Sequence, residues 1–182
     1  MIERFIFAVR EALKHKRELK SLPYAKNITS IDWRNLYDSG IRVLVLDFDG
    51  VLAADKQKKL YVGVDKVLET AQTIFGDHVY IFSNQPTPQR QAYFAEHFPK
   101  IQFLVAKQKP YPDGLLSVIV KEQVSPEKVV LIDDRVLTGG LASVLAGTQC
   151  ILIEKPYMCF YSNMLREILF ISIRAIERLW FR

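Results

Sequence analysis

The stretch that decides the fold is Val43-Leu44-Val45-Leu46-Asp47-Phe48-Asp49-Gly50-Val51-Leu52. Its first four residues are apolar and predict a buried strand. Asp47 and Asp49 follow one residue apart, at the point where the strand ends. Paired carboxylates beside an apolar run are costly to desolvate, so they require a cation or solvent nearby. Taken alone, the stretch fits either a Mg²⁺-assisted phosphoryl-transfer site or a strand that ends in a polar turn.

Outward from this stretch, apolar strands alternate with helical segments through the middle of the chain. Polar residues follow the strands, which is where an open α/β sheet places its site. The alternation predicts an α/β fold, a Rossmann-like three-layer arrangement in which helices cover both faces of a parallel sheet. The expected strands are 43–46, 79–82, 102–105, 129–132 and 150–153, and the expected helices between them are 65–75, 89–97, 114–121 and 141–146.

The composition bounds the class of protein. The 182 residues fit one main domain, and 49% hydrophobic with 25% charged residues indicates a soluble chain with a sizeable core. The net charge of +5 comes entirely from residues 1–20 and 163–182, so the neutral centre argues against a nucleic-acid partner. The cysteines, Cys150 and Cys159, lack metal-ligand spacing, and we expect reduced thiols in a cytoplasmic protein.

Both ends of the chain have the pattern of amphipathic helices, at residues 2–20 and 162–181. Neither end has the run of about 20 apolar residues that a bilayer span needs. We expect these helices either to dock on an anionic membrane surface, at the inner face of the membrane, or to pack on the core or on a second copy of the chain. The expected units are an N-terminal helix and linker (1–30), a core (31–160) and a C-terminal basic helix (161–182).

Four polar clusters follow the strands of the expected sheet. They are Asp47 with Asp49, Ser83-Asn84, Lys109-Pro110 and Asp133-Asp134. Because the carboxyl ends of parallel strands meet at one edge, the acidic clusters are candidate Mg²⁺ ligands, and Ser83, Asn84 and Lys109 are candidates to hold phosphate oxygens. Singly, each cluster has an ordinary alternative: a helix cap, a surface lysine or a turn. Their common order and edge favour a single site.

With these four motifs the chain resembles the haloacid dehalogenase superfamily of phosphohydrolases, from about residue 31 to residue 153. Within it, the chain is similar to the branch without a cap domain that contains the phosphatidylglycerophosphate phosphatases of bacteria and mitochondria. The lead-in Ile31-Asp32-Trp33, the run Asp134-Arg135-Val136-Leu137-Thr138 and the basic helix after the last strand carry this similarity.

The resemblance implies a role for each matching residue. Asp47 would attack phosphorus and form an aspartyl-phosphate, while Asp49 would protonate the leaving alkoxide and later activate water. Ser83 would hydrogen-bond the phosphoryl group, and Lys109 would neutralise charge on the nucleophile and the phosphate. Asp134 would ligate Mg²⁺ together with Asp47 and the backbone carbonyl of Asp49. In-line positioning and dispersed positive charge are also what phosphoryl transfer requires on physical grounds.

The chain departs from that branch in its fourth motif. The branch usually has Gly then Asp where this chain has Asp133-Asp134, and a further Asp after the Thr where this chain has Gly139. The aspartate pair is expected to compensate, with Asp133 as an outer-shell group or a second metal ligand.

The spacing of the motifs indicates how open the site is to its substrate. Superfamily members that enclose small metabolites usually insert a cap domain between the motifs, and neither the gap from Asp49 to Ser83 nor that from Ser83 to Lys109 has room for one. We therefore expect an open site for a phosphate on something large, or fixed at a surface, unless a neighbouring subunit supplies a lid.

Three functions compete at this point. The first is a Mg²⁺-dependent phosphomonoesterase acting on a phosphatidylglycerophosphate-like headgroup at the membrane surface. The second is a soluble phosphatase for a small-molecule or protein phosphate. The third is a catalytically weakened domain that serves as a scaffold or binding module.

Overall fold

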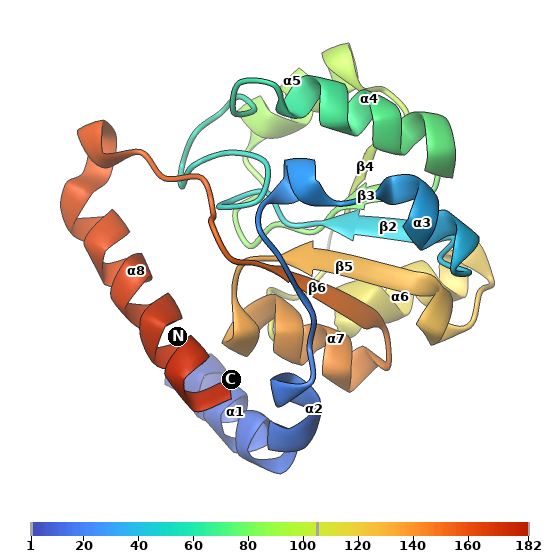
Figure 1. Cartoon of the computed structure of the whole chain (residues 1–182). Coiled ribbons are helices and arrows are strands. Elements are labelled where there is room, and N and C mark those ends of the chain that lie inside the picture. The colour runs from blue at the N-terminus through green and yellow to red at the C-terminus, as the bar shows by residue number, and fades with distance from the viewer. Residues whose placement is uncertain (1, 105, 182) are drawn as a thin grey trace.

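A six-stranded parallel sheet forms the centre of the molecule (Figure 1). The computed structural model describes residues 2–104 and 106–181, without the side chains of residues 160–163 and 166. The strand order is β1-β6-β5-β2-β3-β4, and all neighbouring strands are parallel. The strands are β1 (Tyr24–Ala25), β2 (Val43–Leu46), β3 (Val79–Ile81), β4 (Gln102–Phe103), β5 (Val129–Asp133) and β6 (Gln149–Ile153). The predicted α/β class with a parallel sheet is confirmed.

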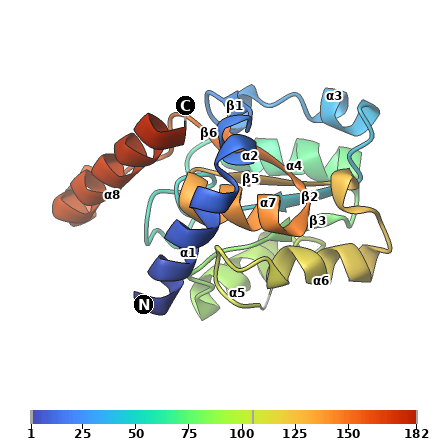
Figure 2. The same ribbon diagram turned by 90° about the horizontal axis from the view of Figure 1, so that it is seen from below.

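Helices cover both faces of the sheet and give the predicted three layers (Figures 1 and 2). Because side chains alternate along a strand, Leu44 and Leu46 of β2 pack into one core, and Val43 and Val45 pack into the other. The first core includes residues from α3 (Trp33–Asp38), α4 (Val64–Phe75) and α5 (Pro88–His97), and the second includes residues from α6 (Asp113–Glu122) and α7 (Leu141–Ala146). Short turns of helix are η1 (Ile28–Ser30), η2 (Pro126–Lys128) and η3 (Val136–Gly140).

The observed elements follow the predicted ones with small shifts at their ends. The edge strand β1 was not predicted, because two residues are too few to show an alternating pattern. The π-helical turn η3 was also not predicted. The strand expected over 102–105 ends at Phe103, and Val105 lies outside the described residues.

The N-terminal segment forms two helices instead of the single predicted one. Helix α1 (Ile2–Lys14) and helix α2 (Lys16–Lys20) are separated at His15, whose backbone leaves the helical conformation. The long C-terminal helix α8 (Phe160–Phe181) forms as predicted and begins two residues earlier than expected. Its last turn joins α1, α2 and η3 in a third apolar cluster that includes Ala8, Leu19 and Phe181. The N-terminal half of α8 extends away from the sheet (Figures 1 and 2).

Candidate active site

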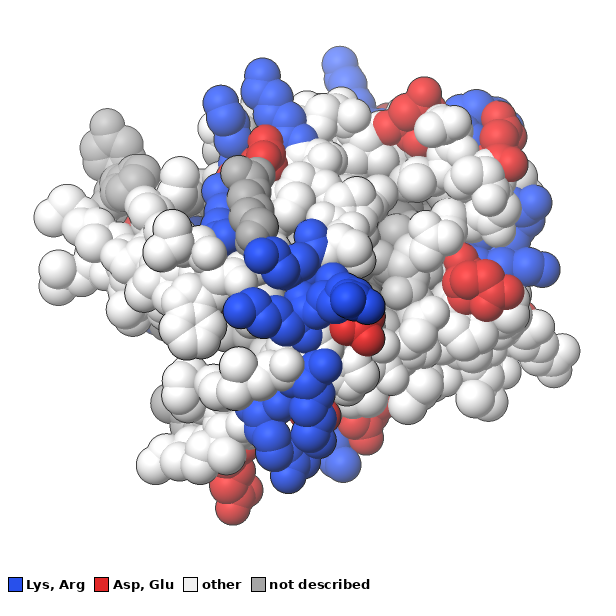
Figure 3. Space-filling view, turned by 60° about the horizontal axis from the view of Figure 1, so that its bottom comes forward, with Lys and Arg blue, Asp and Glu red and all other residues white. Residues whose placement is uncertain are grey.

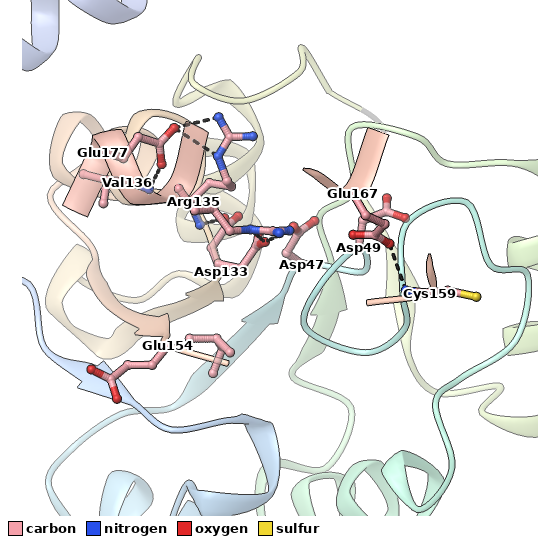
Figure 4. Close-up of polar contacts among 12 residues, drawn as sticks. Asp47, Asp49, Asp133, Arg135, Val136, Glu154, Cys159, Glu167 and Glu177 are labelled. Carbon is pink, nitrogen blue, oxygen red and sulfur yellow. Dashed lines mark hydrogen bonds and ion pairs between the residues drawn. The ribbon is translucent and has the colours of Figure 1, made fainter. Parts of the chain in front are cut away.

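The carboxyl ends of β2, β3 and β5 bring the predicted motifs together. The register pairs Leu46 of β2 with both Ile81 of β3 and Ile132 of β5, so the residues that follow these strands are neighbours. One carboxylate oxygen from each of Asp47, Asp133 and Asp134 lies within 4.8 Å of the other two. All three side chains are buried. The edge predicted from the strand pattern therefore carries a cluster of acids (Figure 4).

Lys109 lies within this cluster and is itself buried. Its Nζ is 2.8 Å from Asp47 Oδ1 and 2.6 Å from Asp133 Oδ2. Burial lowers the pKa of the Lys109 ammonium, but the two carboxylates outweigh it and raise that pKa above its usual range. Burial raises the pKa of Asp47 well above its usual range, with the neighbouring carboxylates acting in the same direction and Lys109 against them. Lys109 is therefore a fixed positive charge beside Asp47.

Asp133 occupies the space that a side chain at position 139 would take. A Cβ built on Gly139 would lie 2.1 Å from the Asp133 carboxylate. The Asp133 carboxylate accepts a hydrogen bond from Lys109 Nζ at one oxygen. Its other oxygen accepts a hydrogen bond from the backbone N–H of Arg135, 2.9 Å away. Both Asp133 oxygens are thus occupied by donors of the protein. This geometry fits the expected compensation for Gly139 and favours the outer-shell role.

Ser83 and Asn84 follow β3 and hold the neighbouring loops. The Ser83 hydroxyl accepts a hydrogen bond from the Gln85 amide, 3.0 Å away, a contact that leaves its proton to be donated. The Asn84 amide group receives the backbone N–H of Lys109 at 2.8 Å and donates to the Lys109 carbonyl at 3.2 Å. Asn84 therefore positions Lys109, and its predicted contact with the substrate stays a prediction. Both Asn84 and Lys109 also line the cavity described below.

Asp49 is held by an arginine that sequence reasoning missed. Arg90 of α5 is 1% exposed and donates to both oxygens of Asp49, at 2.5 and 2.9 Å. It also donates to the carbonyls of Gln57 and Gln85, and its guanidinium lies over the Phe48 ring. Arg90 thereby joins Asp49 to the turn that follows it and to α5. The sequence did not indicate this contact, because Arg90 is the single arginine of a weakly amphipathic helix and belongs to none of the four motifs.

Asp134 receives a second unpredicted arginine, from the C-terminal helix. Arg174 Nε donates to Asp134 Oδ2 at 2.6 Å, and Arg174 Nη2 contacts the same oxygen. Burial raises the pKa of Asp134 to about 6, with Arg174 opposing the rise. Gly50 lets the loop after β2 approach Asp134 closely. Its φ is +86°, and a Cβ at this position would lie 2.5 Å from Asp134 Oδ2.

A further ion pair docks α8 on the loop after β5 (Figure 4). Arg135 donates to Glu177 Oε1 at 2.6 and 3.0 Å, and the backbone N–H of Val136 donates to Glu177 Oε2 at 2.9 Å. The next residue, Arg178, donates to the carbonyls of Ile153 and Glu154. These contacts fix the second half of α8 next to the acidic cluster.

A cavity of about 550 Å³ opens above the cluster, between the loops that follow the central strands and the two terminal helices, α1 and α8. Its floor includes Asp47, Asp49 and Lys109. Arg4, Phe5 and Ala8 of α1 and Phe170, Ile173, Arg174 and Glu177 of α8 contribute to its lining. No inserted domain covers the site within the described residues, as predicted. The site is nevertheless less open than expected, because the ends of the chain form part of its wall.

The donor set at the cluster suits a hard divalent cation. Asp47, Asp133 and Asp134 offer carboxylate oxygens, and the described residues place no His or Cys ligand among them. Mg²⁺ and similar cations prefer such oxygen donors. The Asp49 carboxylate is not part of the cluster, so its predicted contribution to metal binding would come from its backbone carbonyl.

A parallel sheet whose central strand is followed directly by Asp47, beside a buried lysine and two further aspartates, defines a phosphatase of the haloacid dehalogenase type. The family model described as "Mitochondrial PGP phosphatase" matches residues 3–158, and the chain belongs to this family. A search of curated proteins found no match.

The first two of the following solved structures share the fold at low sequence identity. A predicted phosphoglycolate phosphatase from Haemophilus somnus is 13% identical, with a TM-score of 0.53 over 65% of this chain and 88% of that one. Another solved structure is 15% identical, with a TM-score of 0.54 over 76% of this chain and 82% of that one. An uncharacterised protein from Corynebacterium glutamicum is 21% identical, with a TM-score of 0.48 over 75% of this chain and 96% of that one.

Proposed function

We propose that this phosphatase uses Mg²⁺ to hydrolyse a phosphomonoester through an aspartyl-phosphate on Asp47, and that its substrate is phosphatidylglycerophosphate at a membrane surface. The observation that carries the chemistry is the position of Asp47, buried beside Lys109 in a cluster with two other carboxylates. Membership of the PGP phosphatase family supports the choice of substrate.

In the first half of the proposed reaction, an Asp47 oxygen attacks phosphorus and the bond to the alcohol oxygen breaks. Lys109 opposes the rise in the pKa of Asp47 and offsets charge on the phosphoryl oxygens. Asp49, after leaving its ion pair with Arg90 and taking up a proton from solvent, gives that proton to the leaving alkoxide. Mg²⁺, held by Asp47, Asp134 and the Asp49 carbonyl, would supply further positive charge to the phosphoryl group.

In the second half, Asp49 takes a proton from water, and the resulting hydroxide attacks the phosphorus of the aspartyl-phosphate. The bond between Asp47 and phosphorus breaks, which restores the carboxylate and releases inorganic phosphate. Both oxygens of Asp49 are bound by Arg90 in this structure. Proton transfer by Asp49 therefore requires this ion pair to loosen when the substrate binds.

The terminal helices support action at a lipid surface, because they turn their large apolar residues outward. On α8 the buried side chains include Glu167, Arg174 and Glu177, whereas Leu165 is 82% exposed and Leu179 is 84% exposed. A helix of a soluble domain normally does the reverse.

Helix α1 has the same inverted arrangement. It buries Ala8 and Glu11 and exposes Ile2, Phe5 and Ile6. Lys and Arg gather in a band beside a largely uncharged lobe on this face of the molecule (Figure 3). Apolar side chains next to basic ones suit an interface with anionic lipid.

The membrane contact that we propose is peripheral. None of the helices within residues 2–104 and 106–181 combines the length and apolar character of a transmembrane span. The family description refers to mitochondrial enzymes, whereas the sequence led us to expect a cytoplasmic protein, which stays a prediction.

The test is phosphate release from phosphatidylglycerophosphate in anionic vesicles with Mg²⁺. The wild-type protein should release phosphate, and Asp47→Asn should reduce release to background because the nucleophile is lost. Asp65→Asn, an exposed acid on α4, serves as the matched control and should keep full activity. Equal activity of Asp47→Asn and the wild type would contradict the role of Asp47.

A parallel assay on soluble phosphomonoesters separates the substrate from the chemistry. We expect a higher kcat/KM for the lipid than for soluble esters, together with binding to anionic vesicles. Higher kcat/KM on soluble esters without vesicle binding would favour the soluble phosphatase instead.

A further inference from the structure

Arg174 of the C-terminal helix α8 contacts Asp134, one of the candidate metal ligands of the cluster. Its Nε and Nη2 contact one oxygen of Asp134, and its side chain is 10% exposed. It also lines the cavity above Asp47 and Lys109. An arginine used only to hold a helix would have no need to contact a candidate metal ligand.

The remaining nitrogen of this guanidinium has no acceptor. Arg174 Nη1 is buried and lacks a hydrogen-bond partner among the described residues. Leaving a charged donor buried without an acceptor is more unfavourable than leaving an ordinary polar group unpaired. The arrangement therefore lacks an anionic or carbonyl oxygen beside Arg174.

The charge balance indicates what that oxygen belongs to. With Asp49 paired to Arg90, the acids Asp47, Asp133 and Asp134 face the cations Lys109 and Arg174, which leaves one net negative charge when all are ionised. A divalent cation turns this into one net positive charge, which suits a phosphoryl dianion. Without Arg174 the cation-loaded site would be neutral.

We propose that Arg174 is a substrate-binding residue supplied by the C-terminal helix. When a divalent cation binds Asp134, it competes with the guanidinium for that carboxylate, and Arg174 then donates to an oxygen of the phosphoryl group. The guanidinium fork matches phosphate oxygens in geometry and charge. This inference rests on the proposed function only in requiring that the site holds a divalent cation and a phosphoryl group.

The neighbouring residues of α8 keep Arg174 within reach of both partners. Glu177 is bound by Arg135 and by the backbone N–H of Val136, and Arg178 donates to the carbonyls after β6. These contacts anchor the helix in the turn that follows Arg174, without using Asp134. A shift of the Arg174 side chain therefore does not require the helix to leave the core.

The experiment measures binding of Mg²⁺ alone, and then binding of inorganic phosphate to the Mg²⁺-saturated full chain, by calorimetry. In Arg174→Met, phosphate affinity should fall about tenfold or more, because a charge-assisted contact is lost. Mg²⁺ affinity should stay equal or rise, because a competing cation is removed. A residue that only anchors the helix would not be expected to lower phosphate affinity while leaving Mg²⁺ affinity equal or higher.

Arg178→Met is the matched control on the same helix. It removes an arginine that does not contact the cluster, and Glu177 still anchors the helix, so its phosphate affinity should stay within about twofold of the wild type. Arg174→Lys keeps the charge without the fork and should bind phosphate more weakly than the wild type. It also provides a variant to measure if Arg174→Met does not fold.

Several outcomes would overturn the proposal. The first is an unchanged phosphate affinity in Arg174→Met, or in Arg174→Lys if the Met variant does not fold. The second is a loss of phosphate affinity in Arg178→Met as large as that in Arg174→Met. Failure of the wild type to bind phosphate would count against both this inference and the proposed function. Normal phosphate binding without hydrolysis of the lipid would leave Arg174 in its role and reject only the lipid substrate.

Discussion

At the scale of single residues, each acid that the motifs placed at the sheet edge has a basic partner from a different part of the chain. Asp47 and Asp133 share Lys109, Asp49 has Arg90, and Asp134 has Arg174. Buried carboxylates need such partners because desolvation without compensation costs several kcal/mol per ion. The lysine was predicted from its motif, whereas both arginines lie on helices without any local signature.

The position of Asp133 leads to a prediction about a reciprocal exchange. Asp133→Gly should reduce phosphate release by about tenfold or more, because Lys109 loses one of its two carboxylates. Adding Gly139→Asp to that variant should recover much of the loss, since a side chain at position 139 enters the same space. Steady-state kinetics of the single and double variants measure this.

The single variant Gly139→Asp is the control for this exchange. Gly139→Asp alone should destabilise the protein, because its Cβ would clash with the Asp133 carboxylate. A double variant no more active than Asp133→Gly would show that the two positions are not interchangeable.

The raised pKa of Asp134 predicts how Mg²⁺ binding depends on pH. Asp134 has a pKa of about 6 in the metal-free protein, and a carboxylate must lose its proton to bind a cation. The Mg²⁺ affinity should therefore be nearly constant above pH 7 and fall about tenfold per unit well below pH 6. Calorimetric titrations between pH 5 and 8 measure it, and a flat profile across that range would contradict it.

At the scale of elements, the strand ends were predictable because the signal is local. An apolar run followed at once by acids fixes both the strand and the place of its polar residues, as at Leu46-Asp47. The orientation of α8 was not predictable in this way. Its pattern shows two faces, and which one meets the core depends on Asp134 and Arg135, far away in the sequence.

The outward apolar face of α8 leads to a prediction about membrane binding. Ile176 and Leu179 are exposed, so replacing both with Glu should weaken binding to anionic vesicles about tenfold or more through lost apolar burial and added negative charge. Hydrolysis of a soluble phosphomonoester should stay unchanged, because neither side chain lines the cavity.

A co-sedimentation assay with anionic vesicles measures this effect. Val120→Glu is the matched control, because Val120 is 77% exposed on α6, a helix on another part of the surface. Equal vesicle binding by the α8 variant and the wild type would remove this face from the lipid interface.

At the scale of the whole molecule, the acidic cluster makes stability depend on pH and on metal. The folded-state pKa of Asp134, about 6, lies above its ordinary value of 3.8, so around pH 5 the folded protein holds a proton that the unfolded chain has lost. The Asp134 contribution to the free energy of unfolding should therefore increase as pH falls from 7 to 5. Saturating Mg²⁺ should remove most of this slope, because the cation holds Asp134 in its ionised form.

Urea denaturation at pH 5.5 and 7.5, with EDTA or with Mg²⁺, checks this prediction. Asp134→Asn should remove most of the gain seen in EDTA, since it deletes the titrating group. If the metal-free protein were less stable at pH 5.5 than at 7.5, the cluster would not control the pH dependence in this range.

The pairing of β2 with β5 has a consequence for how the protein folds. It joins Val43 to Val129, so Asp47 and the last two acids come from opposite halves of the chain. Contacts between such distant residues form late, because a long loop must close first. Neither half can assemble the cation site on its own. Acquisition of metal affinity during refolding would therefore mark completion of the central sheet rather than any early intermediate.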